Sequence, residues 1–169
     1  MNISLRRALP LLLSLAICVP ARAVMPDEAA PELVGTTLDG ASFKLSDLRG
    51  KVVYLDFWAS WCGPCRISMP KLEQMRKAWG GTGFEVIGIN LDGQADAAQK
   101  LLAVVGVSYP IVRGVDPKLV EQYGIIKLPA SYVIDRKGIV RYIYHGFSIA
   151  GFEQVRPEVE SIILTGKTR

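Results

Sequence analysis

The chain has 169 residues, half of them apolar, which suits one domain of ordinary size with a sizeable core. Its formal net charge of +4 belongs mostly to Arg6, Arg7 and Arg22, which lie in an N-terminal segment without acidic residues, and the rest of the chain is almost neutral. No basic patch with interleaved aromatic residues is visible, so the sequence gives no support to nucleic-acid binding.

Residues 1–23 have the three parts of a secretory signal peptide. Arg6 and Arg7 form a positive start, residues 8–19 are mostly apolar, and Ala21-Arg22-Ala23 supplies the small residues that a signal peptidase requires. The apolar stretch is shorter than the roughly 20 residues that a membrane-spanning helix needs. We therefore predict a periplasmic protein cleaved after Ala23; an uncleaved membrane anchor facing the periplasm is the alternative.

Cleavage at this point would leave two of the three cysteines. Cys18 would be removed, and Cys62 and Cys65 would remain two residues apart. A disulfide that closes so small a loop removes little entropy from the unfolded chain. The pair is therefore better suited to being formed and broken than to stabilising the fold.

The first half of the mature chain predicts a domain that starts with a hairpin. Residues 24–31 are interpreted as a short polar linker and residues 32–169 as the domain. A hairpin is expected over 32–44 with Asp39-Gly40 at its turn. It is followed by a turn or single helical turn over 46–50, capped by Ser46, and by a buried strand over 51–58. A helix is expected from Cys62 to Trp79, with a kink at Pro70 and an end at Gly80-Gly81.

The second half predicts alternating strands and helices. The expected strands cover 84–90, 130–134 and 139–145. One helix is expected over 95–105 and a short one from Pro117 to Tyr123, capped by Asp116. A last helix is expected to begin near Arg156, with Pro157 in its first turn. The four-residue connection from Asp135 to Gly138 indicates an antiparallel hairpin. The fold class is therefore α/β, with a central mixed sheet covered by helices on both faces.

The motif Trp61-Cys62-Gly63-Pro64-Cys65 follows a predicted strand and opens a helix. A structural zinc site uses the same cysteine spacing but needs four ligands. His145 is the sole histidine, so such a site would be incomplete. A helix N-terminus carries free N–H groups and a partial positive charge, which would stabilise Cys62 as the attacking thiolate. Cys65, one turn further on, would be buried and would resolve the mixed disulfide.

The segment from Asp56 to Cys65 resembles the active-site segment of thioredoxin. From Glu32 to Leu164 the chain is similar to the exported TlpA/ResA-type reductases, a branch that overlaps the redoxin and AhpC/TSA group. The signal peptide, the N-terminal hairpin with Leu48-Arg49-Gly50-Lys51, and an added helix between Asn90 and Pro129 favour this branch over cytoplasmic thioredoxin. The resemblance implies a thioredoxin fold with an inserted helical segment before a cis-proline loop.

The resemblance also implies roles for single residues. Asp56 would relay a proton to and from the buried cysteine, although many exported relatives have no acid there. Leu128 and Pro129 would form the cis-proline loop, with the Leu128 backbone pairing with substrate. Trp61 would border the substrate groove, which Gly63 and Pro64 leave open. Trp58, Met69 and Met75 are expected in the core, and Asp92 lies near the position of an active-site acid in some relatives.

The leading functional prediction is a periplasmic dithiol reductase that acts through Cys62 and Cys65 without a cofactor or metal. Its implied partners are exported proteins with cysteines, such as apocytochrome c or metal-site assembly proteins, and a membrane-bound thiol electron donor; a monomer is expected. The alternatives are a disulfide oxidant or isomerase, and a copper metallochaperone that uses Cys62, Cys65 and His145. A thiol peroxidase is disfavoured because Ala59 stands where a threonine is needed.

Overall fold

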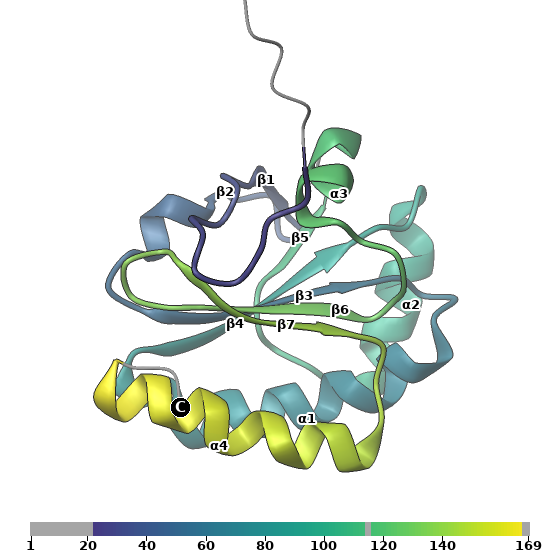
Figure 1. Cartoon of the computed structure of the whole chain (residues 1–169). Coiled ribbons are helices and arrows are strands. Elements are labelled where there is room, and N and C mark those ends of the chain that lie inside the picture. Colours follow the sequence, from purple (N-terminus) through teal and green to yellow (C-terminus); the bar gives the residue numbers. More distant parts are fainter. Residues whose placement is uncertain (1–21, 114–115, 167–169) are drawn as a thin grey trace, which may run out of the picture.

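The computed structural model describes residues 22–113 and 116–166. Its strands form one seven-stranded sheet in the order β2-β1-β5-β4-β3-β6-β7 (Figure 1). The strands are β1 (Val34–Thr37), β2 (Ser42–Lys44), β3 (Val52–Trp58), β4 (Phe84–Asn90), β5 (Ile111–Arg113), β6 (Ala130–Ile134) and β7 (Val140–His145). The α-helices are α1 (Gly63–Trp79), α2 (Ala95–Val105), α3 (Pro117–Tyr123) and α4 (Ile149–Thr165), and 3₁₀ turns cover Leu45–Leu48 and Gly80–Thr82.

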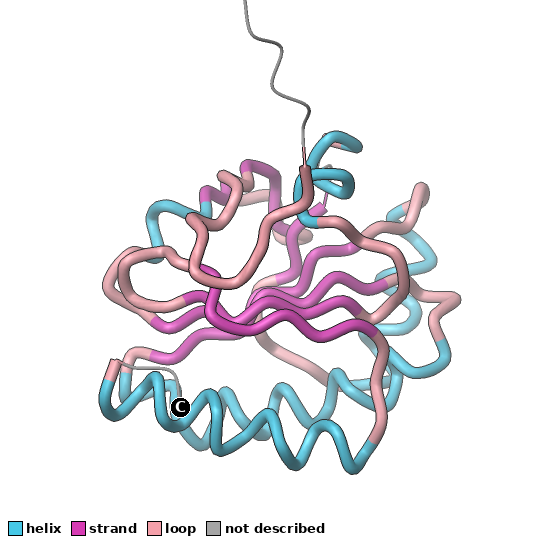
Figure 2. Tube along the Cα trace, viewed as in Figure 1, coloured by secondary structure: helices cyan, strands magenta, loops and turns pink. Residues whose placement is uncertain are grey.

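The sheet is mixed, as predicted. Strands β3, β4 and β5 run parallel to one another, whereas β1, β2, β6 and β7 pair antiparallel with their neighbours. Figure 2 shows the strands as a continuous twisted layer between helices. The fully buried strand β3 lies near the middle of this layer and leads directly into the loop before α1.

Helices cover both faces of the sheet, which confirms the predicted fold class. Side chains alternate along β3: Tyr54 and Trp58 belong to one core cluster, whereas Leu55 and Phe57 belong to another. The first cluster includes residues of α1, α2 and α4, and the second includes residues of α3 and of the N-terminal segment. In Figure 1, α1 and α4 lie below the sheet and α3 lies above it.

Two elements differ from the sequence prediction. Strand β5 is not among the predicted elements, because it has only three residues and no alternating pattern. The sequence also predicts a last helix that begins near Arg156, whereas α4 begins at Ile149. Ser148 caps its start by accepting a hydrogen bond from the Gly151 N–H at 3.1 Å. Pro157 therefore lies inside the helix, where it removes one backbone hydrogen bond, and burial of apolar side chains on this helix offsets that loss.

Residues 24–31 are not a free linker, and this corrects the sequence interpretation. Val24 is buried, and its N–H donates to the Gln122 carbonyl at 2.8 Å. Asp27 donates its N–H to Val140 at 2.8 Å and forms an ion pair with Arg141. The reason is that this segment contains apolar residues that fill the sheet face beside α3. The packed domain therefore includes Val24.

Smaller points complete the comparison with the sequence. Ser46 does not cap the turn at Leu45–Leu48, which begins after Lys44 without a side-chain cap. The predicted signal peptide, apart from Arg22 and Ala23, lies outside the described residues. Among the helices of residues 22–113 and 116–166, none has the length and apolar character needed to cross a bilayer.

Candidate active site

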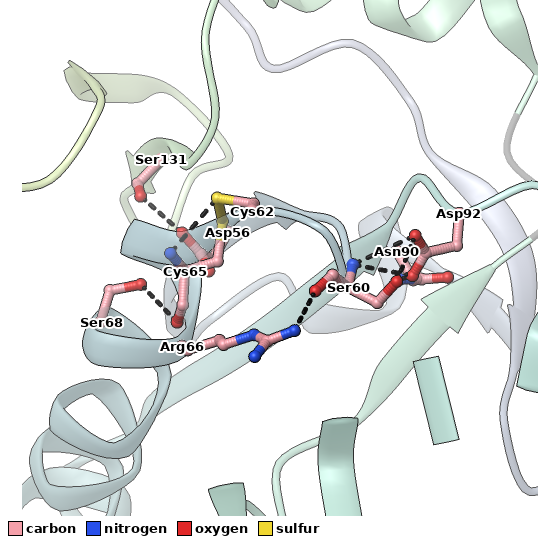
Figure 3. The surroundings of a disulfide bond; sticks show 9 residues. All are labelled: Asp56, Ser60, Cys62, Cys65, Arg66, Ser68, Asn90, Asp92 and Ser131. Atoms are coloured by element: carbon pink, nitrogen blue, oxygen red, sulfur yellow. Dashed lines mark hydrogen bonds between the residues drawn. A yellow bond between two sulfur atoms is a disulfide. The ribbon is translucent and has the colours of Figure 1, made fainter. Parts of the chain in front are cut away.

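Cys62 and Cys65 form a disulfide at the amino end of α1 (Figure 3). The S–S distance is 2.03 Å and the two Cα atoms are 5.3 Å apart. Cys62 is 5% exposed, whereas Cys65 is fully buried. The pair therefore has an outer sulfur that a partner can approach and an inner sulfur within the core, as the sequence predicted.

The local sequence explains why α1 begins here. Cys62 has an extended backbone and occupies the N-cap position, with Pro64 in the first turn. The Cys62 Sγ accepts a hydrogen bond from the Cys65 N–H at 3.2 Å. A Cβ atom added to Gly63 would meet nothing within 4 Å, so the space over the first turn is open. The free N–H groups and partial positive charge of the helix start therefore act on the outer sulfur.

The loop before α1 is held by Asp92, which follows β4. The Asp92 carboxylate accepts hydrogen bonds from the Ser60 N–H at 2.9 and 3.1 Å and from the Ser60 hydroxyl at 2.9 Å. Asn90 donates to the same carboxylate at 2.8 Å, and Arg66 donates to the Ser60 carbonyl at 3.1 Å. Asp92 therefore lies near the site, as the resemblance suggested, but it contacts the loop. The parallel pairing of β3 and β4 brings their carboxyl ends together and could have indicated this contact.

Asp56 is fully buried on β3 and lies on the same sheet face as Tyr54 and Trp58, which is the face that α1 covers. The Ser131 hydroxyl donates to Asp56 Oδ1 at 2.7 Å (Figure 3). Asp56 Oδ2 has no hydrogen-bond partner among the residues that the structure describes. Burial raises the pKa of Asp56 to about 7, and the bond from Ser131 opposes this rise. Both protonation states are therefore populated near neutral pH.

The peptide bond between Leu128 and Pro129 is cis, as the resemblance implied. Leu128 packs against both core clusters, one of which contains the two cysteines. The Gly146 N–H donates to the Pro129 carbonyl at 2.6 Å and fixes the loop to the end of β7. Trp61, the residue directly before Cys62, is 73% exposed. The cis peptide bond and the exposed Trp61 ring therefore agree with the expectations for these two residues.

The structure does not bring the copper ligands of the alternative hypothesis together. His145 is exposed at the end of β7. Within residues 22–113 and 116–166, no three His, Cys, Asp or Glu side chains form a group that could hold a metal ion. Trp58, Met69 and Met75 are buried in the core, as expected. Ser60 and Ser131 are not among the predicted site residues, because each contacts an acidic residue that lies far away in the sequence, Asp92 for Ser60 and Asp56 for Ser131.

Comparisons with known proteins agree with this geometry. The AhpC/TSA family model matches residues 26–143. The thiol–disulfide oxidoreductase ResA of Geobacillus thermodenitrificans is 31% identical over 140 residues, which cover 83% of this chain and 79% of that protein. ResA of Bacillus subtilis is 31% identical over 117 residues, which cover 69% of this chain and 65% of that protein.

Solved structures lead to the same group. A Chlorobium tepidum protein assigned as the thiol:disulfide interchange protein DsbE has a TM-score of 0.78 and 38% identity, with 83% of this chain and 99% of that chain covered. The cysteine pair at the start of α1, the sheet that carries it and these relatives all agree. The chain therefore belongs to the AhpC/TSA family and is a thiol–disulfide oxidoreductase with a thioredoxin fold.

Proposed function

We propose that this protein is an exported dithiol reductase, in which Cys62 attacks disulfides of other proteins and Cys65 resolves the mixed disulfide. The observation that carries this proposal is the asymmetry of the pair. Cys62 caps the start of α1 near the surface, whereas Cys65 is buried on the side where Asp56 lies. An outer nucleophile and an inner resolving group are what a two-step exchange requires.

The reaction begins with both cysteines reduced. The Cys62 thiolate attacks one sulfur of the partner disulfide, so a mixed disulfide forms and the other partner sulfur leaves as a thiolate. Cys65 then loses its proton and attacks the Cys62 sulfur, and the second partner sulfur leaves. Two electrons pass to the partner, which becomes a dithiol, and the Cys62–Cys65 disulfide forms, as seen in the structure.

Asp56 is proposed to accept the proton that Cys65 loses in the second step. A buried thiol needs a base, because burial disfavours its charged form. Asp56 Oδ2 is buried without a hydrogen-bond partner among the described residues, so it can receive a proton. With a pKa of about 7, the Asp56 carboxyl can accept and return protons near neutral pH.

The surface around Cys62 is proposed to bind an extended segment of the partner. Support comes from the exposed ring of Trp61 and from the open space over Gly63. Pro64 adds no N–H group that would compete for substrate. Leu128 and the cis Pro129 lie on the neighbouring loop, where the Leu128 backbone would pair with the bound segment.

The reducing direction is favoured by what surrounds the outer sulfur. Gly63 and Pro64 supply no side-chain donor to stabilise a Cys62 thiolate, and an ionised Asp56 disfavours one. Equilibration with glutathione or dithiothreitol pairs tests this. A reducing role predicts a potential below about −180 mV, the value of protein disulfide isomerase, and toward that of thioredoxin, about −270 mV. A potential above about −180 mV would favour the oxidant or isomerase alternative.

The proposed setting is the periplasm. The signal-peptide pattern of residues 1–23 supports export. Reduction there requires a membrane-bound thiol donor, because each turnover leaves the cysteine pair oxidised. The proposed substrates are exported proteins with cysteines, including apocytochrome c and metal-site assembly proteins, and the protein is proposed to act as a monomer.

A further inference from the structure

A pocket opens between the end of β7 and the start of α4, and Pro129 of the cis-proline loop is part of its lining. Its volume is about 460 Å³, and neither cysteine is among the residues that line it. The lining residues that matter here come from β3, α1 and β6: Tyr54, Ser68 and Ser131. The pocket therefore reaches the buried polar residues Ser68 and Ser131.

Ser131 connects this pocket with Asp56. It is 5% exposed, lines the pocket, and donates its hydroxyl hydrogen to Asp56 Oδ1 at 2.7 Å (Figure 3). A hydroxyl has one donor and two acceptor positions. The donor is used on Asp56, so the oxygen can still accept a hydrogen bond from the pocket side. Register supports this contact, because Ser131 on β6 lies directly opposite Asp56 on β3.

The two buried tyrosines near Asp56, Tyr54 and Tyr109, stay neutral around pH 7. Burial raises the pKa of the Tyr54 hydroxyl, the charge of Asp56 raises it further, and a hydrogen bond with Ser131 opposes both effects. The pKa of Tyr109 is raised by burial and then by the charges of Asp56 and Glu73. Cys65 faces this region from α1 and does not titrate while it is in the disulfide. Among these buried groups, Asp56 is therefore the one with a pKa near 7 in the oxidised protein, and the pocket lining also contains the ionisable residues Lys127, His145 and Glu158.

We propose that Ser131 positions the Asp56 carboxyl and is the contact through which Asp56 exchanges protons with solvent in this pocket. The inference deepens the proposed function and rests on it. When Asp56 has accepted the Cys65 proton on Oδ2, rotation about the Asp56 Cβ–Cγ bond turns that O–H toward Ser131 and the Ser131 hydroxyl hydrogen turns toward the pocket. The carboxyl then donates its proton to Ser131 Oγ. Ser131 gives its own hydroxyl proton to a water or buffer base in the pocket. Rotation of the hydroxyl restores the bond to Oδ1, so the net change is one proton released.

Nuclear magnetic resonance of the Asp56 carboxyl carbon in the oxidised, selectively ¹³C-labelled protein tests the proposal. The titration midpoint reports positioning, and relaxation dispersion at the midpoint reports the rate of proton exchange. Ser131→Ala is expected to raise the midpoint, because the carboxylate loses a donor, and to slow exchange about tenfold or more. Ser131→Thr keeps the hydroxyl and is the matched control, expected to remain near the wild-type values.

The pH dependence of the second exchange step provides the functional readout. Ser131→Ala should move this profile to higher pH by the same amount as the Asp56 midpoint, and it should have no further effect in an Asp56→Asn background. An unchanged midpoint and exchange rate in Ser131→Ala would overturn the inference. If Asp56→Asn itself left the rate unchanged from pH 6 to 9, the proton-relay part of the proposed function would fail instead.

Discussion

Asp56 shows how one buried residue can link stability to chemistry. A carboxyl group with no exposed surface loses its hydration, and one hydrogen bond from Ser131 compensates only in part. The protein therefore favours the protonated form until the pH approaches 7. This costs stability at neutral pH, and the proposed return is a proton acceptor beside a buried thiol.

Asp56→Asn is expected to make stability less dependent on pH. The folded pKa of Asp56, about 7, lies above the ordinary value of 3.8, so the folded state holds a proton that the unfolded state has lost. Stability from this group is therefore fully present below pH 4 and is lost as the pH rises to 7. At pH 8 the folding stability lost through this group is about 4 kcal/mol at most, since each unit of difference between the folded and unfolded pKa corresponds to about 1.36 kcal/mol.

Urea unfolding of the oxidised proteins at pH 5 and pH 8 checks this expectation. The variant should gain stability over wild type mainly at pH 8, and it should catalyse exchange more slowly at neutral pH. Parallel stability curves for the two proteins between these pH values would contradict the burial of an ionisable group at this position.

Residues within the motif could be predicted from sequence, but their partners could not. Cys62, Cys65 and Asp56 lie within ten residues, and the segment that carries them is distinctive. Ser131 is 75 positions from Asp56 in sequence. Its contact depends on which residue of β6 stands opposite Asp56, and a shift of one residue would turn the hydroxyl to the other face. Register of this kind is not readable from composition or periodicity.

At the scale of elements, the turn before β7 joins distant parts of the chain. Asp135 accepts N–H bonds from Lys137 at 2.8 Å and Ile139 at 3.0 Å and pairs with Arg141, and these bonds lower its pKa against the effect of burial. The Gly50 N–H donates to the Arg136 carbonyl at 2.9 Å. The turn that follows the N-terminal hairpin is therefore attached to the turn that closes the sheet.

Gly138→Ala is expected to destabilise the protein by about 1–2 kcal/mol, because Gly138 has a φ of +82°, which alanine rarely adopts. An added Cβ would also lie 2.1 Å from the Arg49 Cζ atom, but the flexible Arg49 side chain can move aside. Gly81→Ala is the matched control, since a Cβ there meets nothing within 4 Å and the change should stay within about 0.5 kcal/mol. Chemical denaturation measures both, and similar losses would contradict the left-handed backbone conformation at Gly138.

Element boundaries show what local sequence signals can and cannot predict. The strand Phe84–Asn90 and the helix Ala95–Val105 agree with their predicted ranges, because clear patterns and a terminal glycine mark them. The predicted start of the last helix near Arg156 is wrong, because Ser148 caps α4 and Pro157 lies inside the helix rather than in its first turn. Tertiary burial of Phe152 and Val155 decides that boundary, and it is not a local signal.

At the scale of the whole molecule, the N-terminal segment belongs to the folded domain. Residues 24–31 lie beside α3 and β7, and the Ala29 backbone bridges to Ile139. The cysteine pair and the core beneath it could be predicted because the motif identifies a known fold. The packing of a short, mixed segment could not, since it has neither periodicity nor a motif.

Removing this segment should lower stability. A protein that begins at Glu32 loses the buried Val24 side chain and the Asp27–Arg141 ion pair that one beginning at Val24 retains. Burial of a valine side chain alone contributes roughly 1.5–3 kcal/mol, so a loss of about 2–4 kcal/mol is expected in urea unfolding. Equal stability of the two proteins would restore the linker interpretation.

The proposed export makes a separate prediction about the N-terminus. Mass spectrometry of the protein from a periplasmic extract should give Val24 as the first residue. The buried position of Val24 implies that an uncleaved anchor would hold the domain close to the bilayer without a free linker. Full-length protein recovered only from membranes would support the anchor and contradict cleavage.

Trapping of mixed disulfides is the most direct measurement of the attacking role of Cys62 and the resolving role of Cys65. Cys65→Ser and Cys62→Ser, each reduced, are incubated with a protein disulfide such as insulin, and mixed disulfides are counted by mass. We expect Cys65→Ser to accumulate a mixed disulfide with insulin through Cys62, because the attacking sulfur is intact and the resolving sulfur is absent. Cys62→Ser should form none, since Cys65 is fully buried. A stable complex formed by Cys62→Ser, with none from Cys65→Ser, would contradict the account.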